Sequence, residues 1–113
     1  MVERTYQLDS VFGSLSDPTR RDILSRITGQ AMSVSNIAQH YNFSLAGIAK
    51  HLSVLEHAGL ICKTRQGKEQ IVAIDPKGLL AASEYLETYR KLWDTRLESL
   101  DMYLTSRNKR RET

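Results

Sequence analysis

The amino-acid sequence predicts a mainly α fold with one small β-hairpin and a long C-terminal helix. Apolar residues recur every three or four positions over most of residues 6–58 and again over residues 77–106, which is the helical period. Two runs rich in β-branched residues, 60–65 and 70–75, are separated by a short turn that contains Gly67. These observations together predict helices, then a hairpin, then one last long helix.

Length and charge set the scale of the molecule. The 113 residues fit one domain, expected over residues 1–106, followed by a basic tail over residues 107–113 that we expect to be disordered. The net charge of +3 and the pI of about 9.2 suit a polyanionic partner. Between Pro18 and Ile74, seven Lys and Arg stand against three Asp and Glu, so this region carries an excess of +4.

Two helices are expected before residue 30. The first covers residues 6–15, and its apolar face consists of Leu8, Val11, Phe12 and Leu15. Asp17 is a good N-cap for the second helix, and Pro18 stands at the first helical position, where its missing N–H costs nothing. The second helix is expected to end at Gly29 and to bury Ile23, Leu24 and Ile27.

The next segment has the pattern of a helix-turn-helix. Ser33 is the expected cap of a third helix, and Ser44, after a short turn, caps a fourth helix that ends before Gly59. The buried stripe of the fourth helix is Ile48, Leu52, Leu55 and Ala58. Opposite this stripe lie Ala46, Lys50, Ser53 and His57, with Ala49 on its flank. Short outward side chains favour insertion into a DNA major groove. An ordinary amphipathic helix is the alternative.

The hairpin that follows this helix predicts a winged helix-turn-helix fold. Arg65 and Lys68 flank the tip, where their long side chains can reach DNA phosphates beside the groove. The alternative is a solvent-exposed turn whose basic residues contact no DNA. Cys62, in the first strand, is expected to be a small apolar filler. The alternative is a redox switch, which would need a low thiol pKa.

The last helix carries more apolar surface than so small a core needs. Its apolar positions step by three and four, close to a heptad seam: Leu79, Ala82, Leu86, Tyr89, Trp93, Leu97, Leu100 and Leu104. This surplus favours a dimerisation helix. The expected interface residues are Trp93, Leu97, Leu100 and Leu104, with Val11 and Phe12 of the first helix beside them. The alternative is that the aromatic residues fold back on one core.

Several classes of protein do not fit the sequence. It shows no nucleophile with a base, no paired acids and no phosphate-binding loop, so we expect no enzyme. His40, His51, His57 and Cys62 lack the spacing of metal ligands, and no cofactor is expected. A single cysteine excludes an internal disulfide, the N-terminus lacks the apolar core of a signal peptide, and no apolar run approaches the roughly 20 residues of a membrane span. We expect a cytoplasmic protein without membrane contact.

Two motifs, residues 15–24 (LSDPTRRDIL) and residues 50–61 (KHLSVLEHAGLI), resemble the ArsR family of winged-helix transcriptional repressors. The resemblance covers about residues 8–75. It implies a homodimer, paired through its first and last helices, that binds a palindromic operator and blocks transcription. It also implies that Leu45, Ala46, Ala49 and Lys50 occupy the base-facing positions.

The sequence departs from the family pattern in two respects. Many members carry a hydrogen-bonding residue at the position of Leu45 and a serine at that of Ala49, so two candidate base readers are lost. Thymine methyl contacts, Lys50 and DNA shape are the remaining means of sequence recognition. The third helix also has no cysteine, and the last helix has no histidine or cysteine, so neither of the family's familiar metal sites can be built. Residues 93–104 are similar to a branch not associated with metals. No effector can be named.

The predicted DNA-contacting residues are Ser33, Ser44, Leu45, Ala46, Ala49, Lys50, His51, Arg65 and Lys68. A winged-helix module that binds protein instead of DNA is the main rival, and its support is the apolar face of the fourth helix. The basic excess around that helix and the hairpin opposes this rival, because a protein-binding module would not need it.

Overall fold

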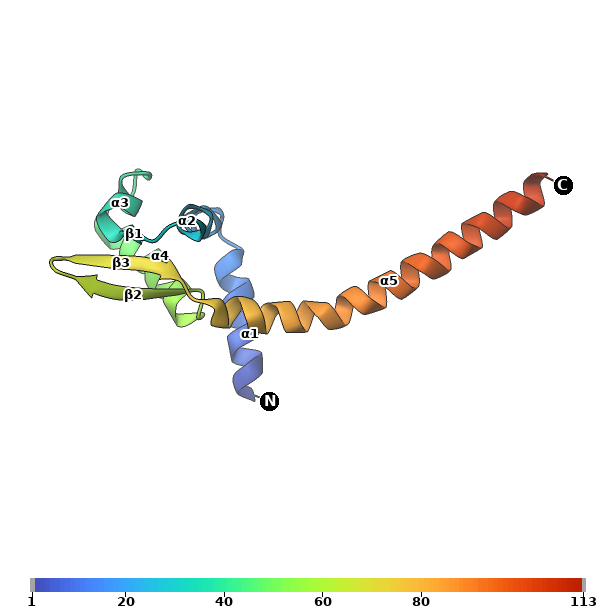
Figure 1. Ribbon diagram of the computed structural model, residues 1–113, viewed down its shortest axis with the longest axis horizontal. Helices are drawn as coiled ribbons and strands as arrows, with labels where there is room; N and C mark the ends of the chain where they lie inside the picture. Colours follow the sequence, from blue (N-terminus) through green and yellow to red (C-terminus); the bar gives the residue numbers. More distant parts are fainter. Residues whose placement is uncertain (1, 113) are drawn as a thin grey trace. The chain divides into compact units, whose positions relative to one another are not determined.

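The computed structural model describes the backbone of residues 2–112 and the side chains of residues 7–108 (Figure 1). It confirms the mainly α fold with a small antiparallel sheet and a long C-terminal helix. The elements in chain order are α1 (Val2–Leu15), α2 (Pro18–Thr28), β1 (Met32–Ser33), α3 (Val34–Ala38), α4 (Leu45–His57), β2 (Ile61–Gln66), β3 (Glu69–Ile74) and α5 (Pro76–Glu112).

The chain divides into two compact units, residues 1–82 and residues 83–113. The first unit holds the winged helix-turn-helix, and within the second the described residues belong to α5. That helix continues to Glu112 and does not end near Ser106 as the sequence analysis expected. The side chains of residues 109–113, in the predicted basic tail, lie outside the described residues, and the boundary at residue 106 stays a prediction.

All three predicted helix caps are present. The Asp17 carboxylate accepts hydrogen bonds from the backbone N–H groups of Thr19 at 2.8 Å and Arg20 at 3.1 Å. The hydroxyl oxygens of Ser33 and Ser44 accept in the same way, at 3.1 Å each, from residues 36 and 47. Side-chain caps of this kind satisfy backbone donors that have no partner inside the helix. The C-terminal end of α4 is also as predicted, since Gly59 has a φ of 75°.

The sheet has the strand order β1-β3-β2 and is antiparallel throughout. β2 and β3 form the predicted hairpin, but its turn is the two-residue Gly67-Lys68 instead of the four residues that the sequence suggested. Gly67 takes a positive φ of 62°, as a tight hairpin turn requires. β1 was not predicted. It pairs with the middle of β3, Met32 opposite Val72, and so ties the segment before α3 to the wing.

The core of residues 1–82 follows the predicted apolar stripes. Its fully or nearly fully buried side chains include Ile23, Leu24 and Ile27 of α2, Ile37 of α3, Ile48, Leu52 and Leu55 of α4, and Leu60, Ile61 and Val72. Val11 is also in this core with 0% of its side chain exposed, so it cannot contact a partner as the sequence analysis proposed. Cys62 is exposed on β2, which corrects its expected role as a small apolar filler. Ile61 takes the buried position, and the alternation of a strand turns its neighbour outward.

The first turn of α5 packs tightly against the end of α4. The backbone N–H of Gly78 donates to the carbonyl oxygen of Gly59 at 2.8 Å. A Cβ atom at position 78 would lie 2.7 Å from the carbonyl oxygen of Ala58, so only glycine allows this approach. This contact fixes the start of α5 on the winged helix-turn-helix.

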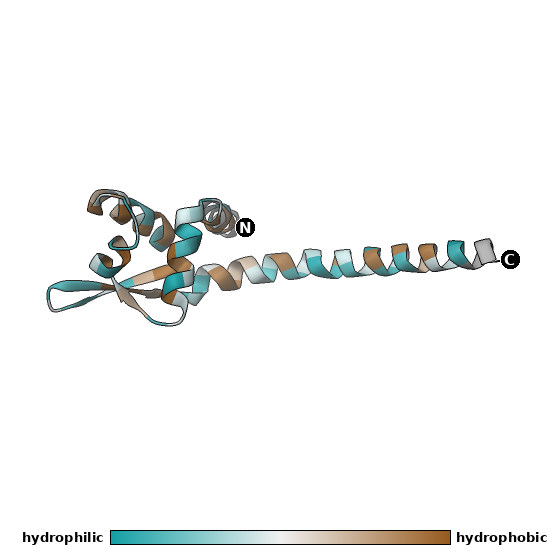
Figure 2. Ribbon diagram, turned by 90° about the horizontal axis from the view of Figure 1, so that it is seen from above, coloured by the Kyte–Doolittle hydropathy of each residue, from teal (hydrophilic) through white to brown (hydrophobic). Residues whose placement is uncertain are grey.

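Apolar residues recur along the rest of α5, as Figure 2 shows by their brown colour. Those of residues 83–108 that remain largely exposed include Leu86, Tyr89, Leu92, Trp93, Leu97, Leu100 and Leu104. Among the described residues, no helix combines the length and apolar composition needed to cross a bilayer.

Candidate nucleic-acid interface

Helices α3 and α4 form the helix-turn-helix, and they contact one another. The predicted inward stripe of α4 is buried, from Ile48 at 0% exposed to Ala58 at 1%. The residues predicted to lie opposite this stripe or on its flank are all exposed: Ala46, Ala49, Lys50, Ser53 and His57. The hairpin extends beyond the helices of this unit as a wing (Figure 1). The outward face of α4 and the wing are therefore open to a partner.

Leu45, at the first position of α4, is the most exposed large apolar residue of that helix, with 64% of its side chain accessible. Ala46 and Ala49 beside it are exposed as well. The side chains of Ala46 and Ala49 are short, so Leu45 is the large apolar side chain exposed at this end of α4. The first hydrogen-bonding side chain on this face is Lys50, one turn further along.

Three exposed cations of this surface have no carboxylate partner among the side chains of residues 7–108. Within the part of the chain whose side chains are described, no ion pair engages Lys50, Arg65 or Lys68. The nearby cations Arg26 and Lys63 are by contrast paired, with Asp22 at 2.9 Å and Glu56 at 3.7 Å. Arg65 instead donates to the carbonyl oxygen of Gly67 at 3.3 Å, which keeps its guanidinium near the wing tip. Uncompensated cations on a helix and a wing suit phosphate contacts.

Arg20 joins the end of α1 to α4, a role that sequence analysis missed. Its guanidinium donates to the carbonyl oxygens of Ser14 at 2.9 Å and Gly13 at 3.2 Å. The same group lies 3.3 Å from Nδ1 of His51. A hydrogen bond in this contact runs from the guanidinium to Nδ1, because an arginine guanidinium only donates. Arg20 thus orients His51, a predicted DNA-contacting residue that is half-buried.

The turn between the two helices is held by aromatic and charged side chains. The Tyr41 hydroxyl donates to Asp22, and the Phe43 ring lies 6.2 Å from that of Tyr41 and 5.8 Å from that of His51. Hydrogen bonds from Tyr41 and Arg26 lower the pKa of Asp22 from its ordinary value of 3.8. Burial and the bond to Asp22 raise the pKa of Tyr41 above 10.0. These contacts connect α2, through the turn, to His51 in the middle of α4.

The two predicted serines differ in their availability. Ser33 is only 4% exposed, its hydroxyl caps α3, and its backbone pairs with β3, so it is not accessible to DNA. This corrects its place among the DNA-contacting residues. Ser44 is exposed and also caps α4 through Gly47.

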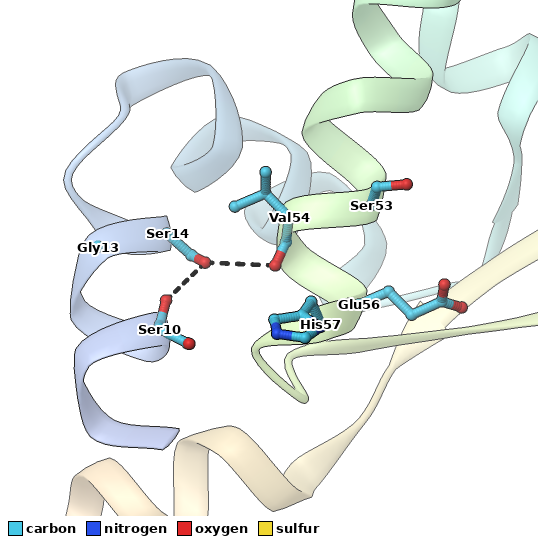
Figure 3. A pocket seen from close by; sticks show the side chains of 7 residues that line it. All are labelled: Ser10, Gly13, Ser14, Ser53, Val54, Glu56 and His57. Atoms are coloured by element: carbon cyan, nitrogen blue, oxygen red, sulfur yellow. Dashed lines mark hydrogen bonds between the residues drawn. The ribbon is translucent and has the colours of Figure 1, made fainter. Parts of the chain in front are cut away.

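A groove of about 790 Å³ lies between α1 and α4 (Figure 3). Its lining residues are Ser10, Gly13, Ser14, Ser53, Val54, Glu56 and His57. The Ser14 hydroxyl lies 2.7 Å from the carbonyl oxygen of Ser10 and 3.5 Å from that of Val54. Among these described side chains, no hydrogen bond joins a serine to His57, and Glu56 pairs with Lys63. Over residues 7–108, no three His, Cys, Asp or Glu side chains gather as a metal site would require.

Comparison with known proteins decides the family. Residues 15–62 match the family model of a helix-turn-helix domain. The chain is 41% identical over 61 residues to the transcriptional repressor SdpR of Bacillus subtilis. The matched segment covers 54% of this chain and 68% of SdpR. A crystal structure of the ArsR family transcriptional regulator RHA00566 is 32% identical, with a TM-score of 0.74 over 80% of this chain and 93% of that one. The chain belongs to the ArsR family.

Two further matches agree with this assignment. The HTH-type transcriptional regulator Rv2034 of Mycobacterium tuberculosis is 31% identical over 81 residues, 72% of this chain and 76% of that protein. An ArsR-like regulator from Rhodococcus is 33% identical, with a TM-score of 0.70 over 85% of this chain and 91% of that one. This ArsR-family member is therefore a DNA-binding transcriptional regulator with a winged helix-turn-helix.

Proposed function

We propose that this regulator is a repressor that binds a palindromic operator as a homodimer, with α4 in the major groove and the wing beside the phosphates. The observation that carries the proposal is the exposed face of α4 and the wing, where Lys50, Arg65 and Lys68 have no carboxylate partner among the described residues. Short side chains on that face permit close approach to base edges. Its similarity to the repressor SdpR supports repression.

The exposed apolar residues of α5 support the second subunit of this homodimer. The proposed seam consists of Trp93, Leu97, Leu100 and Leu104, each at least 47% exposed, with Phe12 of α1. A Mycobacterium bovis winged helix-turn-helix domain of the same fold, 23% identical, is described as homodimeric. A twofold dimer would place two copies of α4 on the two half-sites of one operator. We further propose a cytoplasmic location and no enzymatic activity, as the DNA-binding role of the family suggests.

The test compares Lys50→Ala, Arg65→Ala and Lys68→Ala with Lys77→Ala, an exposed lysine outside α4 and the wing. Each of the two wing variants should weaken binding to operator and random duplex alike, and should reduce the slope of log affinity against log salt by about 1. Lys50→Ala should weaken operator binding more than random binding. Lys77→Ala should change neither quantity.

A protein-binding module is the second candidate, and the exposed Leu45 favours it. The same titrations separate the two functions, because an apolar protein contact does not weaken steeply with salt. Unchanged DNA affinity in a folded triple variant of Lys50, Arg65 and Lys68 would contradict the proposed DNA interface.

A further inference from the structure

The N-terminal turns of α4 present an apolar tip where a DNA-reading helix needs a recognition surface. Over residues 45–50 the exposed side chains are Leu45, Ala46, Ala49 and Lys50. The first three carry no hydrogen-bonding group, so they cannot recognise the donors and acceptors of a base edge. The one apolar feature that the major groove displays is the C5-methyl group of thymine.

Leu45 contributes little to the fold. It lies directly after the Ser44 cap, 64% of its side chain is exposed, and the adjacent core is closed by Ile48, which is 0% exposed. The neighbouring Ala46 and Ala49 are short and also exposed, so an apolar partner can approach the methyl groups of Leu45.

Charge around the tip indicates which apolar partner fits. Lys50 follows one turn later, and neither it nor the wing residues Arg65 and Lys68 has an ion-pair partner among the described side chains. The acidic residue of α4, Glu56, stands near the other end of the helix and pairs with Lys63. A partner that combines negative charge with isolated methyl groups is duplex DNA rich in thymine.

We propose that Leu45, with Ala49 beside it, recognises thymine methyl groups in the operator half-site, and that Lys50 is the hydrogen-bonding side chain among residues 45–50. At the contacted positions, this regulator then recognises the methyl group itself. This inference rests on the proposed placement of α4 in the major groove.

The test removes the methyl group without changing base pairing. The binding site is first selected from a random duplex pool, and each thymine of one half-site is then replaced singly by deoxyuridine. At the position that Leu45 contacts, the replacement should weaken binding by roughly fourfold, the value expected for one buried methyl group.

Protein variants assign that loss to Leu45. In Leu45→Ala, thymine and deoxyuridine duplexes should bind equally at this position, because the side chain that contacts the methyl is gone. Leu45→Met, which keeps an apolar side chain of similar volume, should retain the preference for thymine. Val54→Ala, which shortens another exposed apolar residue of α4, is the matched control and should also retain it. Circular dichroism and thermal unfolding confirm that each variant folds.

The outcomes separate this inference from the proposed function. A protein that selects no duplex contradicts the proposed function and, with it, this inference. Salt-sensitive binding to a selected site that is indifferent to deoxyuridine overturns the inference alone. So does a selected site without thymine in the half-site, or an equal deoxyuridine penalty in Leu45→Ala and the parent protein.

Discussion

At the residue scale, Arg20 shows how a charged side chain near the surface can position a DNA-binding helix. The carbonyl groups in the last turns of a helix lack partners within it and attract cations. Arg20 satisfies two of them in α1 and reaches His51 of α4 with the remaining edge of its planar guanidinium. A lysine could not make this fork of bonds. The sequence motif that contains Arg20 marked the family, but only the structure shows this contact between helices.

Acid should destabilise the fold through Asp17 and Asp22. Hydrogen bonds from the backbone N–H groups of Arg20 and Thr19 lower the pKa of Asp17 from 3.8, and the bonds from Tyr41 and Arg26 lower that of Asp22. A carboxyl whose folded pKa lies below its unfolded value stabilises the fold above the unfolded value. This stability is lost as the pH falls through the folded pKa. The free energy of unfolding should therefore fall as the pH drops below about 4.

Asparagine variants test this acid dependence, because asparagine does not titrate and, at position 17, still caps the helix. Chemical denaturation at a series of pH values should show a shallower acid loss in Asp17→Asn and in Asp22→Asn than in the parent protein. The double variant should show the shallowest loss. Equal slopes in all four proteins would mean that other groups control acid unfolding.

At the scale of elements, the contact between Gly59 and Gly78 decides where α5 begins. Gly78→Ala should lower the free energy of unfolding by about 1–3 kcal/mol, because its Cβ would collide with the carbonyl oxygen of Ala58. Gly29→Ala is the matched control, since its Cβ would meet nothing within 4 Å and its φ is −83°. Urea denaturation should separate the two variants clearly. A Gly78→Ala protein as stable as Gly29→Ala would show that the start of α5 shifts freely.

The elements that sequence analysis predicted correctly are those with local signals. The helix caps and the apolar stripe of α4 depend on residues only a few positions apart, so the spacing of residues in the sequence was enough to predict them. These caps are Asp17, Ser33 and Ser44. β1 was missed because its two residues are a strand only through pairing with β3, about 40 positions later. That pairing also hides Ser33. Val11 and Cys62 were misassigned for a related reason, since tertiary packing decides which side of an element faces inward.

At the scale of the whole molecule, the spacing of the exposed apolar residues along α5 fits the pairing of two nearly straight helices. Its exposed apolar positions repeat every eleven residues over residues 86–104: Leu86 and Leu97, Tyr89 and Leu100, Trp93 and Leu104. Eleven residues in three turns give about 3.67 residues per turn, close to the 3.6 of an unstrained helix, whereas a heptad seam requires 3.5. Two copies of α5 could therefore pair along this face with little supercoiling. This refines the heptad-like seam that the sequence analysis described.

The dimer that such pairing would form can be broken at one position. Leu97→Glu should give a monomer, because twofold symmetry would bury two like charges in the seam and desolvating each costs several kcal/mol. Thr95→Glu is the matched control, since it adds the same charge on the opposite side of α5 and should stay dimeric. Sedimentation at several protein concentrations distinguishes the two forms.

Operator binding should follow the assembly state. Without the linked second copy, Leu97→Glu should lose roughly 100-fold or more in operator affinity, because each half-site is then bound independently. Its affinity for a single half-site should stay near that of the parent protein, since the winged helix-turn-helix of residues 1–82 has its own core. A Leu97→Glu protein that sediments as a dimer and binds the operator normally would place the subunit contact elsewhere than on this face of α5.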